Sequence, residues 1–247
     1  MPTRRALLAL PAFLSPQAAR ADQAARNPPA LPLPRPVRLQ PGAAPLMLHA
    51  TVDDRGLELH FAGTGAPSAR FRFPSWYGYA RVFAIRRLRG RDIVFACFEG
   101  NTGTGVYQEI QAAIGQEDDG TMRILALETL HSRSNGPCDS GIWLTIRAEP
   151  RADGSALQLD QVWRRQGSSC PPRPGGPARS RLAWSTPLAW SGRGPMHAPP
   201  TMAGAPHARA LVEASRAKVM AWLGAAPRTE VTQANIEALD LIEVLES

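Results

Sequence analysis

The sequence predicts a mainly β protein, an antiparallel sandwich or barrel of about ten short strands, followed by a short C-terminal α-helical hairpin. Short apolar or alternating runs recur between residues 46 and 191, and turn residues bound each of them. No long helical pattern interrupts these runs, and helical periodicity begins only after residue 206. Residues 46–191 are therefore expected to form one β-rich domain.

The N-terminal residues 1–21 have the three parts of an export signal peptide. Arg4 and Arg5 form a basic start, residues 6–14 are apolar, and Ala19-Arg20-Ala21 is a typical cleavage site. The apolar run is shorter than the roughly 20 residues that a membrane-spanning helix needs. We therefore expect a periplasmic or secreted chain that starts at Asp22, exported by either the twin-arginine or the general route.

Two segments rich in proline and glycine flank the expected domain. Residues 22–45 contain the run NPPALPLPRPVRLQPGAAP, and proline both fixes φ and removes a backbone donor. We expect an extended, polyproline-like linker there. Residues 192–206, GRGPMHAPPTMAGAP, have the composition of a second connector.

The expected strands come largely in pairs that turn residues join into hairpins. The runs are 46–52, 56–62, 69–73, 80–88, 92–98, 105–114, 122–130, 141–148, 155–163 and 180–190. The runs 80–88 and 92–98 are apolar on both faces, so we expect both to be central strands. In the outer hairpins apolar and polar residues alternate more regularly, as in strands that have one solvent-exposed face.

Residues 207–247 are expected to form a helical appendage. HARALVEASRAKVMAWLG and TEVTQANIEALDLIEVLES both place apolar residues at helical spacing. Each predicted helix is amphipathic and too short to be stable alone. We therefore expect the two helices to pack on each other and on the β domain, or to dock on a partner.

The net charge is moderately positive. The chain carries +7 at pH 7, and loss of the three arginines of residues 1–21 would leave +4. The densest basic run, IRRLRGRD at 85–92, lies across an expected hairpin turn. A nucleic-acid-binding protein gathers its charge on one face, so this distribution predicts no nucleic acid partner.

Two of the three cysteines are expected to form a disulfide. Cys138 and Cys170 lie in turn-rich segments beside prolines, and an exported chain meets an oxidising compartment. Cys97 lies inside the apolar run DIVFACF. We expect it to be a buried, unreactive thiol.

The tripeptide Asp139-Ser140-Gly141 resembles the surroundings of the nucleophile in chymotrypsin-like serine proteases. Cys138 and Ile142 stand where that family has glycines, and its alanine-histidine-cysteine stretch is absent from the sequence. We interpret the segment as a turn that leads into a strand. In that turn Asp139 and Ser140 would bond to the local backbone.

One hairpin contains a candidate metal site. If the strands on either side of Asp54-Arg55 close symmetrically, His49 faces His60 and Glu58 lies on the same face. Two imidazoles and a carboxylate are ligands that zinc and copper accept. A bulge at Gly56 would shift this register and separate the two histidines, which would then be ordinary solvent-facing residues.

Two further features are candidates for ligand binding. The loop EGNTGTGVYQ at 99–108 resembles a phosphate cradle, but a strand-like pattern follows it where a cradle has a helix. We interpret it as a strand-to-strand loop in which Asn101, Thr102 and Thr104 could line a ligand mouth. Trp143 alternates against apolar neighbours, so it should face away from the core, where an aromatic ring can stack on a sugar.

These patterns predict an exported, non-catalytic binding or accessory protein whose partner is a periplasmic protein or a glycan. No assembled set of nucleophile, base and acid favours an enzyme. Two alternatives stay open: a periplasmic hydrolase, and a metal-binding protein that uses His49 and His60. Apart from zinc or copper at those histidines, no cofactor is expected.

Overall fold

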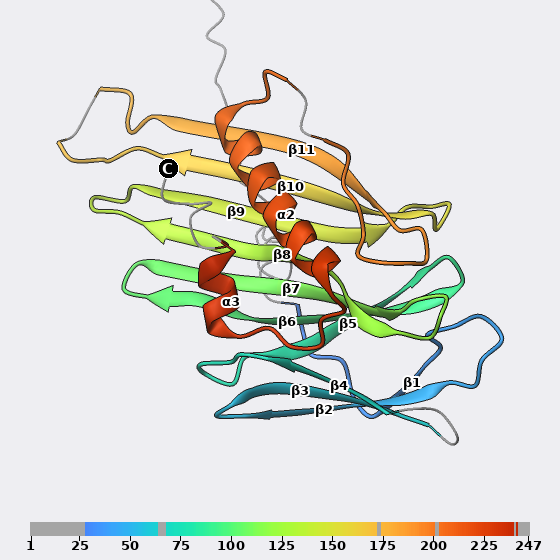
Figure 1. Cartoon of the computed structure of the whole chain (residues 1–247). Coiled ribbons are helices and arrows are strands. Elements are labelled where there is room, and N and C mark those ends of the chain that lie inside the picture. The colour runs from blue at the N-terminus through green and yellow to red at the C-terminus, as the bar shows by residue number, and fades with distance from the viewer. Residues whose placement is uncertain (1–27, 64–67, 172–173, 201–202, 240, 242–247) are drawn as a thin grey trace, which may run out of the picture.

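The computed structural model describes residues 28–63, 68–171, 174–200, 203–239 and 241. Within these residues the chain forms two antiparallel sheets and two helices (Figure 1), which confirms the mainly β prediction. The predicted export signal, residues 1–21, lies outside the described part of the chain. No described helix is long and apolar enough to cross a membrane.

The smaller sheet has four strands and the larger sheet has seven. The order of the smaller sheet is β1-β2-β3-β4, with β1 (Arg35–Val37), β2 (Leu46–Asp53), β3 (Gly56–Ala62) and β4 (Ala69–Phe73). The order of the larger sheet is β11-β10-β9-β8-β7-β6-β5, with β5 (Arg81–Leu88), β6 (Arg91–Gly103), β7 (Val106–Gln116), β8 (Met122–Asn135), β9 (Gly141–Pro150), β10 (Ala156–Gln166) and β11 (Arg179–Ala189). Each of the ten expected runs corresponds to one strand. The sequence analysis missed only β1, a three-residue strand that contains Pro36.

The two sheets share a core, as in a sandwich. Alternate residues of the small sheet and of β6 and β7 are buried in one apolar cluster with residues of the helices. Its members include Leu48, Leu57, Leu59, Phe61, Phe71, Val94, Ala96, Phe98, Ile110, Ile114, Val219, Leu223 and Ile236. Full burial of each large apolar side chain stabilises the fold by roughly 1.5–3 kcal/mol. Because neither sheet closes on itself, the architecture is not a closed barrel.

The expectation that residues 80–88 form a central strand is wrong. Strand β5 is the last strand of the seven-stranded sheet, whereas β6 is interior as expected. The large sheet curls until β5 approaches β9, where Arg86 and Glu149 form an ion pair at 3.0 Å. The amide of Leu31 also donates to the carbonyl of Val82 at 2.8 Å. Residues of β5 also pack into two apolar clusters, Val82 into one and Ala84 and Leu88 into the other. Strand β5 is therefore covered on both faces while it remains at an edge, which explains its apolar pattern.

Parts of both proline-rich segments are buried against the fold, unlike the extended linkers that were expected. Val37 and Leu39 are buried, and β1 pairs with β2. In the second segment Met196 is buried and its amide donates to the carbonyl of Leu125 at 2.8 Å. These parts of both segments therefore pack against the β structure.

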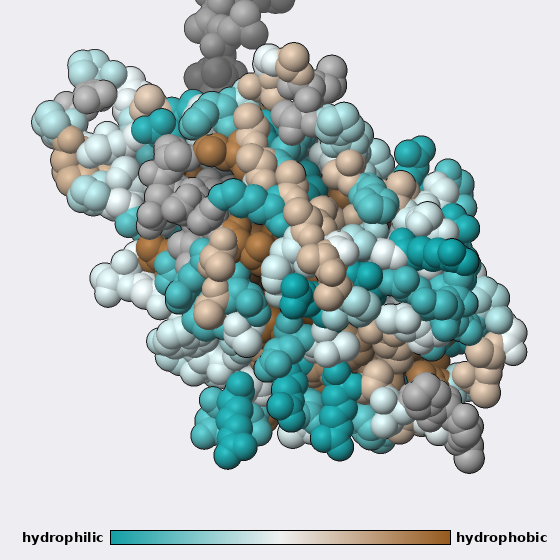
Figure 2. Space-filling model, in the orientation of Figure 1, coloured by the Kyte–Doolittle hydropathy of each residue, from teal (hydrophilic) through white to brown (hydrophobic). Residues whose placement is uncertain are grey.

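Helix α2 (His207–Ala225) crosses one face of the large sheet, and α3 (Gln233–Ala238) follows it (Figure 1). The buried guanidinium of Arg216 donates to Glu128 of β8 at 2.5 and 3.1 Å and to Gln161 of β10 at 2.9 Å. Helix α2 is thus docked on the chain's own sheet. Figure 2 shows mostly hydrophilic and pale residues on this side of the molecule, with a few strongly hydrophobic ones beside the helix.

Candidate ligand-binding site

The face of the large sheet turned away from α2 carries the main candidate site. Along β9, Leu144 and Ile146 lie beneath α2, so the alternating residues Trp143, Thr145 and Arg147 point to the opposite face. An open trough of about 820 Å³ lies on that face, and residues of β8, β9, β10 and β11 line it. The size is within the usual range of ligand sites.

Cross-strand pairing arranges the residues of this face in rows. Trp143 of β9 pairs with Arg133 of β8 on one side and with Arg164 of β10 on the other. Arg164 in turn pairs with Arg181 of β11. Directly paired residues share a face, with their Cβ atoms about 5 Å apart. Trp143 therefore lies between two arginines in a continuous row.

The trough is strongly basic. Its lining includes the arginines 147, 164, 165, 179 and 181, and Asp160 is its one acidic residue. Among the described residues, no carboxylate forms an ion pair with Arg147, Arg165, Arg179 or Arg181. A concave surface lined by one sign of charge attracts counter-ions, so this trough favours an anion.

One residue of the lining, His131, belongs to a cluster of polar groups that includes the buried Glu109. The imidazole of His131 lies 3.3 Å from the hydroxyl of Thr145, and its ring centroid is 6.2 Å from that of Tyr107. Glu109 pairs with His131 in the sheet and forms a 3.1 Å ion pair with Arg81. Burial raises the pKa of Glu109, although the guanidinium of Arg81 opposes this effect. Burial and the nearby carboxylate also raise the pKa of the Tyr107 hydroxyl.

The structure brings two of the predicted ligand-binding residues onto one face. Trp143 lines the trough. Thr102 pairs with Tyr107, which pairs with Arg133, so Thr102 belongs to the row that contains Trp143. Asn101 and Thr104 do not line the trough: the amide of Asn101 donates to the side chain of Gln108 at 3.3 Å, and Thr104 lies in the turn between β6 and β7.

The predicted register of the first hairpin is confirmed. Asp53 pairs with Gly56 and His49 pairs with His60, and the imidazole centroids are 6.3 Å apart. At Gly56 φ is +136°, and an added Cβ would lie 2.1 Å from the carbonyl oxygen of Phe73, so this turn requires glycine. The alternative, a bulge at Gly56 that would separate the histidines, does not occur.

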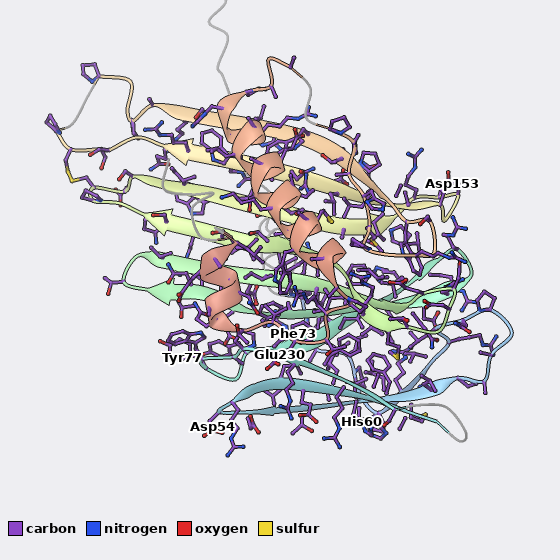
Figure 3. All side chains as sticks on the ribbon, viewed as in Figure 1. Asp54, His60, Phe73, Tyr77, Asp153 and Glu230 are labelled. Carbon is purple, nitrogen blue, oxygen red and sulfur yellow. A yellow bond between two sulfur atoms is a disulfide. The ribbon has the colours of Figure 1, made fainter. Side chains whose placement is uncertain are left out.

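The metal itself stays a prediction. The carboxylate of Glu58, the proposed third ligand, forms ion pairs with Arg72 at 3.1 Å and Arg70 at 3.8 Å. In the described part of the chain no group of three His, Cys, Asp or Glu side chains is placed to hold a metal ion. His60 lies on the small sheet (Figure 3), so a metal there would be separate from the trough.

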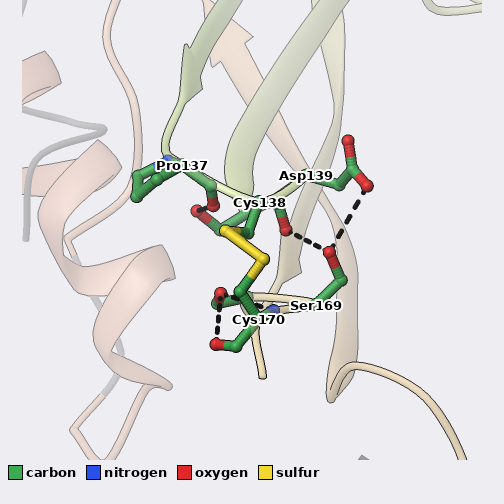
Figure 4. Close-up of a disulfide and its surroundings, with 7 residues drawn as sticks. Pro137, Cys138, Asp139, Ser169 and Cys170 are labelled. Atoms are coloured by element: carbon green, nitrogen blue, oxygen red, sulfur yellow. Dashed lines mark hydrogen bonds between the residues drawn. A yellow bond between two sulfur atoms is a disulfide. The ribbon is translucent and has the colours of Figure 1, made fainter. Parts of the chain in front are cut away.

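The disulfide and the turn around Ser140 are confirmed. Cys138 and Cys170 are bonded, with Cα atoms 5.5 Å apart, and both the amide and the hydroxyl of Ser169 donate to the carbonyl of Cys138 (Figure 4). The hydroxyl of Ser140 donates to the carbonyl of Pro137 at 2.8 Å. Ser140 therefore uses its hydroxyl within the turn, and Cys97 is a buried free thiol as expected.

Sequence reasoning missed the basic trough and drew attention to the wrong arginines. The basic run 85–92 is largely neutralised, because Arg86, Arg87 and Arg91 all form ion pairs with carboxylates. The trough arginines come from three strands and gather only through strand pairing. The one local signal was the basic pair Arg164-Arg165 at the end of an alternating strand.

An exposed aromatic loop was also missed. Trp76, Tyr77 and Tyr79 lie between β4 and β5 and are each more than half exposed. The buried carboxylate of Glu99 orders this loop, because it accepts hydrogen bonds from the hydroxyl of Ser75 and from the amides of Tyr77 and Tyr79. Figure 3 places Tyr77 at the end of the molecule opposite Asp153.

The fold and the trough are the basis for assigning a function, because comparison finds no relative. No family model, curated protein or solved structure matches this chain.

Proposed function

We propose that this chain is an exported, non-catalytic binding protein that holds an anionic ligand in the trough of the seven-stranded sheet. One observation carries the proposal: Trp143 lies between arginines in one cross-strand row, inside an open basic trough. The disulfide is compatible with an extracytoplasmic location.

The side chains of the trough suit an anion that also has a flat face. A guanidinium presents paired N–H donors that match a carboxylate, sulfate or phosphate in two parallel hydrogen bonds. The half-buried indole of Trp143 offers an apolar face for stacking. Because the trough is open to solvent, charge attraction should weaken with salt, over a screening length of about 8–10 Å near physiological ionic strength.

A hydrolase has less support. Nucleophilic catalysis by serine needs a hydroxyl that donates to a base. The hydroxyl of Ser140, the one serine that a motif singled out, donates to a backbone carbonyl instead. Ser140 therefore fits a structural role in the disulfide-linked turns.

The test is binding of a carboxylated polymer to the chain from Asp22 to Ser247. Titration with polygalacturonate should give a saturable heat of binding that falls steeply with added salt, and neutral dextran should give none. The double variant Arg147→Gln/Arg181→Gln should weaken binding about tenfold or more, since each charge-assisted contact is worth about 1.5–3 kcal/mol.

The matched control is Arg151→Gln. Arg151 is an exposed arginine in the turn between β9 and β10, outside the trough. It should bind like the unmodified protein. Equal loss in the control and in the double variant, or equal binding of polygalacturonate and dextran, would refute the trough as the site.

A further inference from the structure

We infer that the ligand is an extended acidic oligosaccharide that crosses the strands of the large sheet, along a track of paired residues that continues beyond the trough to Thr102. This inference rests on the proposed function. It adds the chemical class of the ligand, its direction on the sheet and a minimum length.

The track follows from the register of five consecutive strand pairs. Thr102 pairs with Tyr107, Tyr107 with Arg133 and Arg133 with Trp143, across β6, β7, β8 and β9. The same row continues to β10 and β11, as described for the trough. Neighbouring strands lie about 4.8 Å apart, so six strands give a track of about 24 Å along the sheet. A ligand confined to the trough would use only its β8–β11 part.

Aromatic rings and cations alternate along this track. The guanidinium of Arg133 lies 5.6 Å from the centre of the Tyr107 ring, and Arg133 is also paired with Trp143. The two rings are thus two strands apart, about 10 Å. A chain of rigid rings that carries an acid group on successive units can stack on both aromatics while its carboxylates meet the arginines between and beside them.

The polar groups beside the track favour a sugar over a nucleic acid. The carboxylate of Asp160 lines the trough and accepts a hydrogen bond from the hydroxyl of Ser185 at 2.5 Å. A carboxylate can only accept hydrogen bonds. It therefore suits a ligand, such as a sugar, that offers several hydroxyl donors on each unit. Thr145 and Ser180 of the lining add further hydroxyls.

The experiment compares short and long oligogalacturonates. The chain from Asp22 to Ser247 is titrated with digalacturonate and with an oligogalacturonate that spans about 24 Å. We expect the long oligomer to bind at least tenfold more tightly. Tyr107→Leu should weaken the long oligomer about three- to tenfold and leave digalacturonate unchanged. Arg133→Gln should weaken both ligands, because Arg133 is paired with Trp143. Trp143→Ala should weaken both ligands.

Two controls separate a specific loss of binding from other effects of the substitutions. Arg133 is exposed, so Arg133→Gln tests the track without a core change, and a melting curve of each variant separates lost binding from lost fold. Arg151→Gln should change neither ligand's affinity. The inference is overturned if digalacturonate binds as tightly as the long oligomer, or if single-stranded DNA of equal length and charge binds better than the oligogalacturonate.

The failure of the track and the failure of the proposed function give different results. If Arg147→Gln/Arg181→Gln abolishes binding while Tyr107→Leu leaves the affinity of the long oligomer unchanged, the trough binds an anion and the track is wrong. If no carboxylated ligand binds the folded protein at low salt, the proposed function and the track are both wrong.

Discussion

The ion pair between Arg216 and Glu128 should be a main determinant of stability, because it docks α2 on the sheet. Both side chains are more than nine-tenths buried, and the guanidinium also donates to Gln161. Substitution of Arg216 by Met would leave the carboxylate of Glu128 buried without its counter-charge. We therefore expect Arg216→Met to be strongly destabilising.

The expected magnitude is about 3–5 kcal/mol in the free energy of unfolding, the range for a buried pair that loses one partner. For a chain of this size each kcal/mol lowers the melting temperature by about 2–4 °C, so the loss should be roughly 6–20 °C. The double variant Arg216→Met/Glu128→Leu leaves no buried charge alone. It should recover at least half of the loss, although Gln161 still lacks one partner.

Urea denaturation followed by circular dichroism measures these free energies. Arg87→Met is the matched control, because Arg87 is half exposed in its ion pair with Asp92 and should lose less than about 1 kcal/mol. If Arg216→Met lost no more than the control, or if the double variant were less stable than Arg216→Met alone, the reasoning from buried charge would be refuted.

Three further predictions concern the cysteines and Glu109. Cys138 and Cys170 are 32 residues apart in the sequence. Substitution of both with Ala should lower the free energy of unfolding by about 3–4 kcal/mol, measured by urea denaturation. An unchanged denaturation midpoint would contradict this prediction. Burial raises the pKa of the Cys97 thiol to about 12, so Ellman's reagent at neutral pH should label Cys97 only after denaturation, and rapid labelling of the native protein would argue against burial. The pKa of Glu109 is raised above its ordinary value of 4.5, so its contribution to stability is present below that value and is lost as the pH rises through the raised pKa. Glu109→Gln should therefore flatten the fall of stability as the pH rises above 4.5 in calorimetric melts, and parallel curves for the two proteins would count against it.

Local patterns in the sequence were enough to predict every strand of five residues or more. A strand forms where residues alternate or are apolar between turn residues, and these signals lie within a few positions of each other. The hairpin of His49 and His60 is the clearest case, because the turn at Asp54-Arg55 and the requirement for Gly56 define its register locally. The disulfide was predicted from the turn-rich surroundings of Cys138 and Cys170 and from the expected export of the chain.

The position of β5 shows where such local reasoning ends. Its apolar residues predicted a central strand, but the sheet curls and covers an edge strand on both faces. An apolar pattern predicts that a strand is buried, but it does not predict which other element covers the strand. Val37 and Met196 of the proline-rich segments similarly pack on the fold because distant strands provide their partners.

By itself the sequence determined every strand except β1, the disulfide and the direction in which Trp143 points, and it favoured the hairpin register that the structure has. Only the tertiary structure decided which arginines surround that ring. Arg133, Arg164 and Arg181 lie far apart along the chain, and the pairing of β8 with β9, β9 with β10 and β10 with β11 puts them in one row with Trp143. The physical reason is that the position of a residue along its strand follows from local alternation, whereas its neighbours across the sheet depend on non-local pairing.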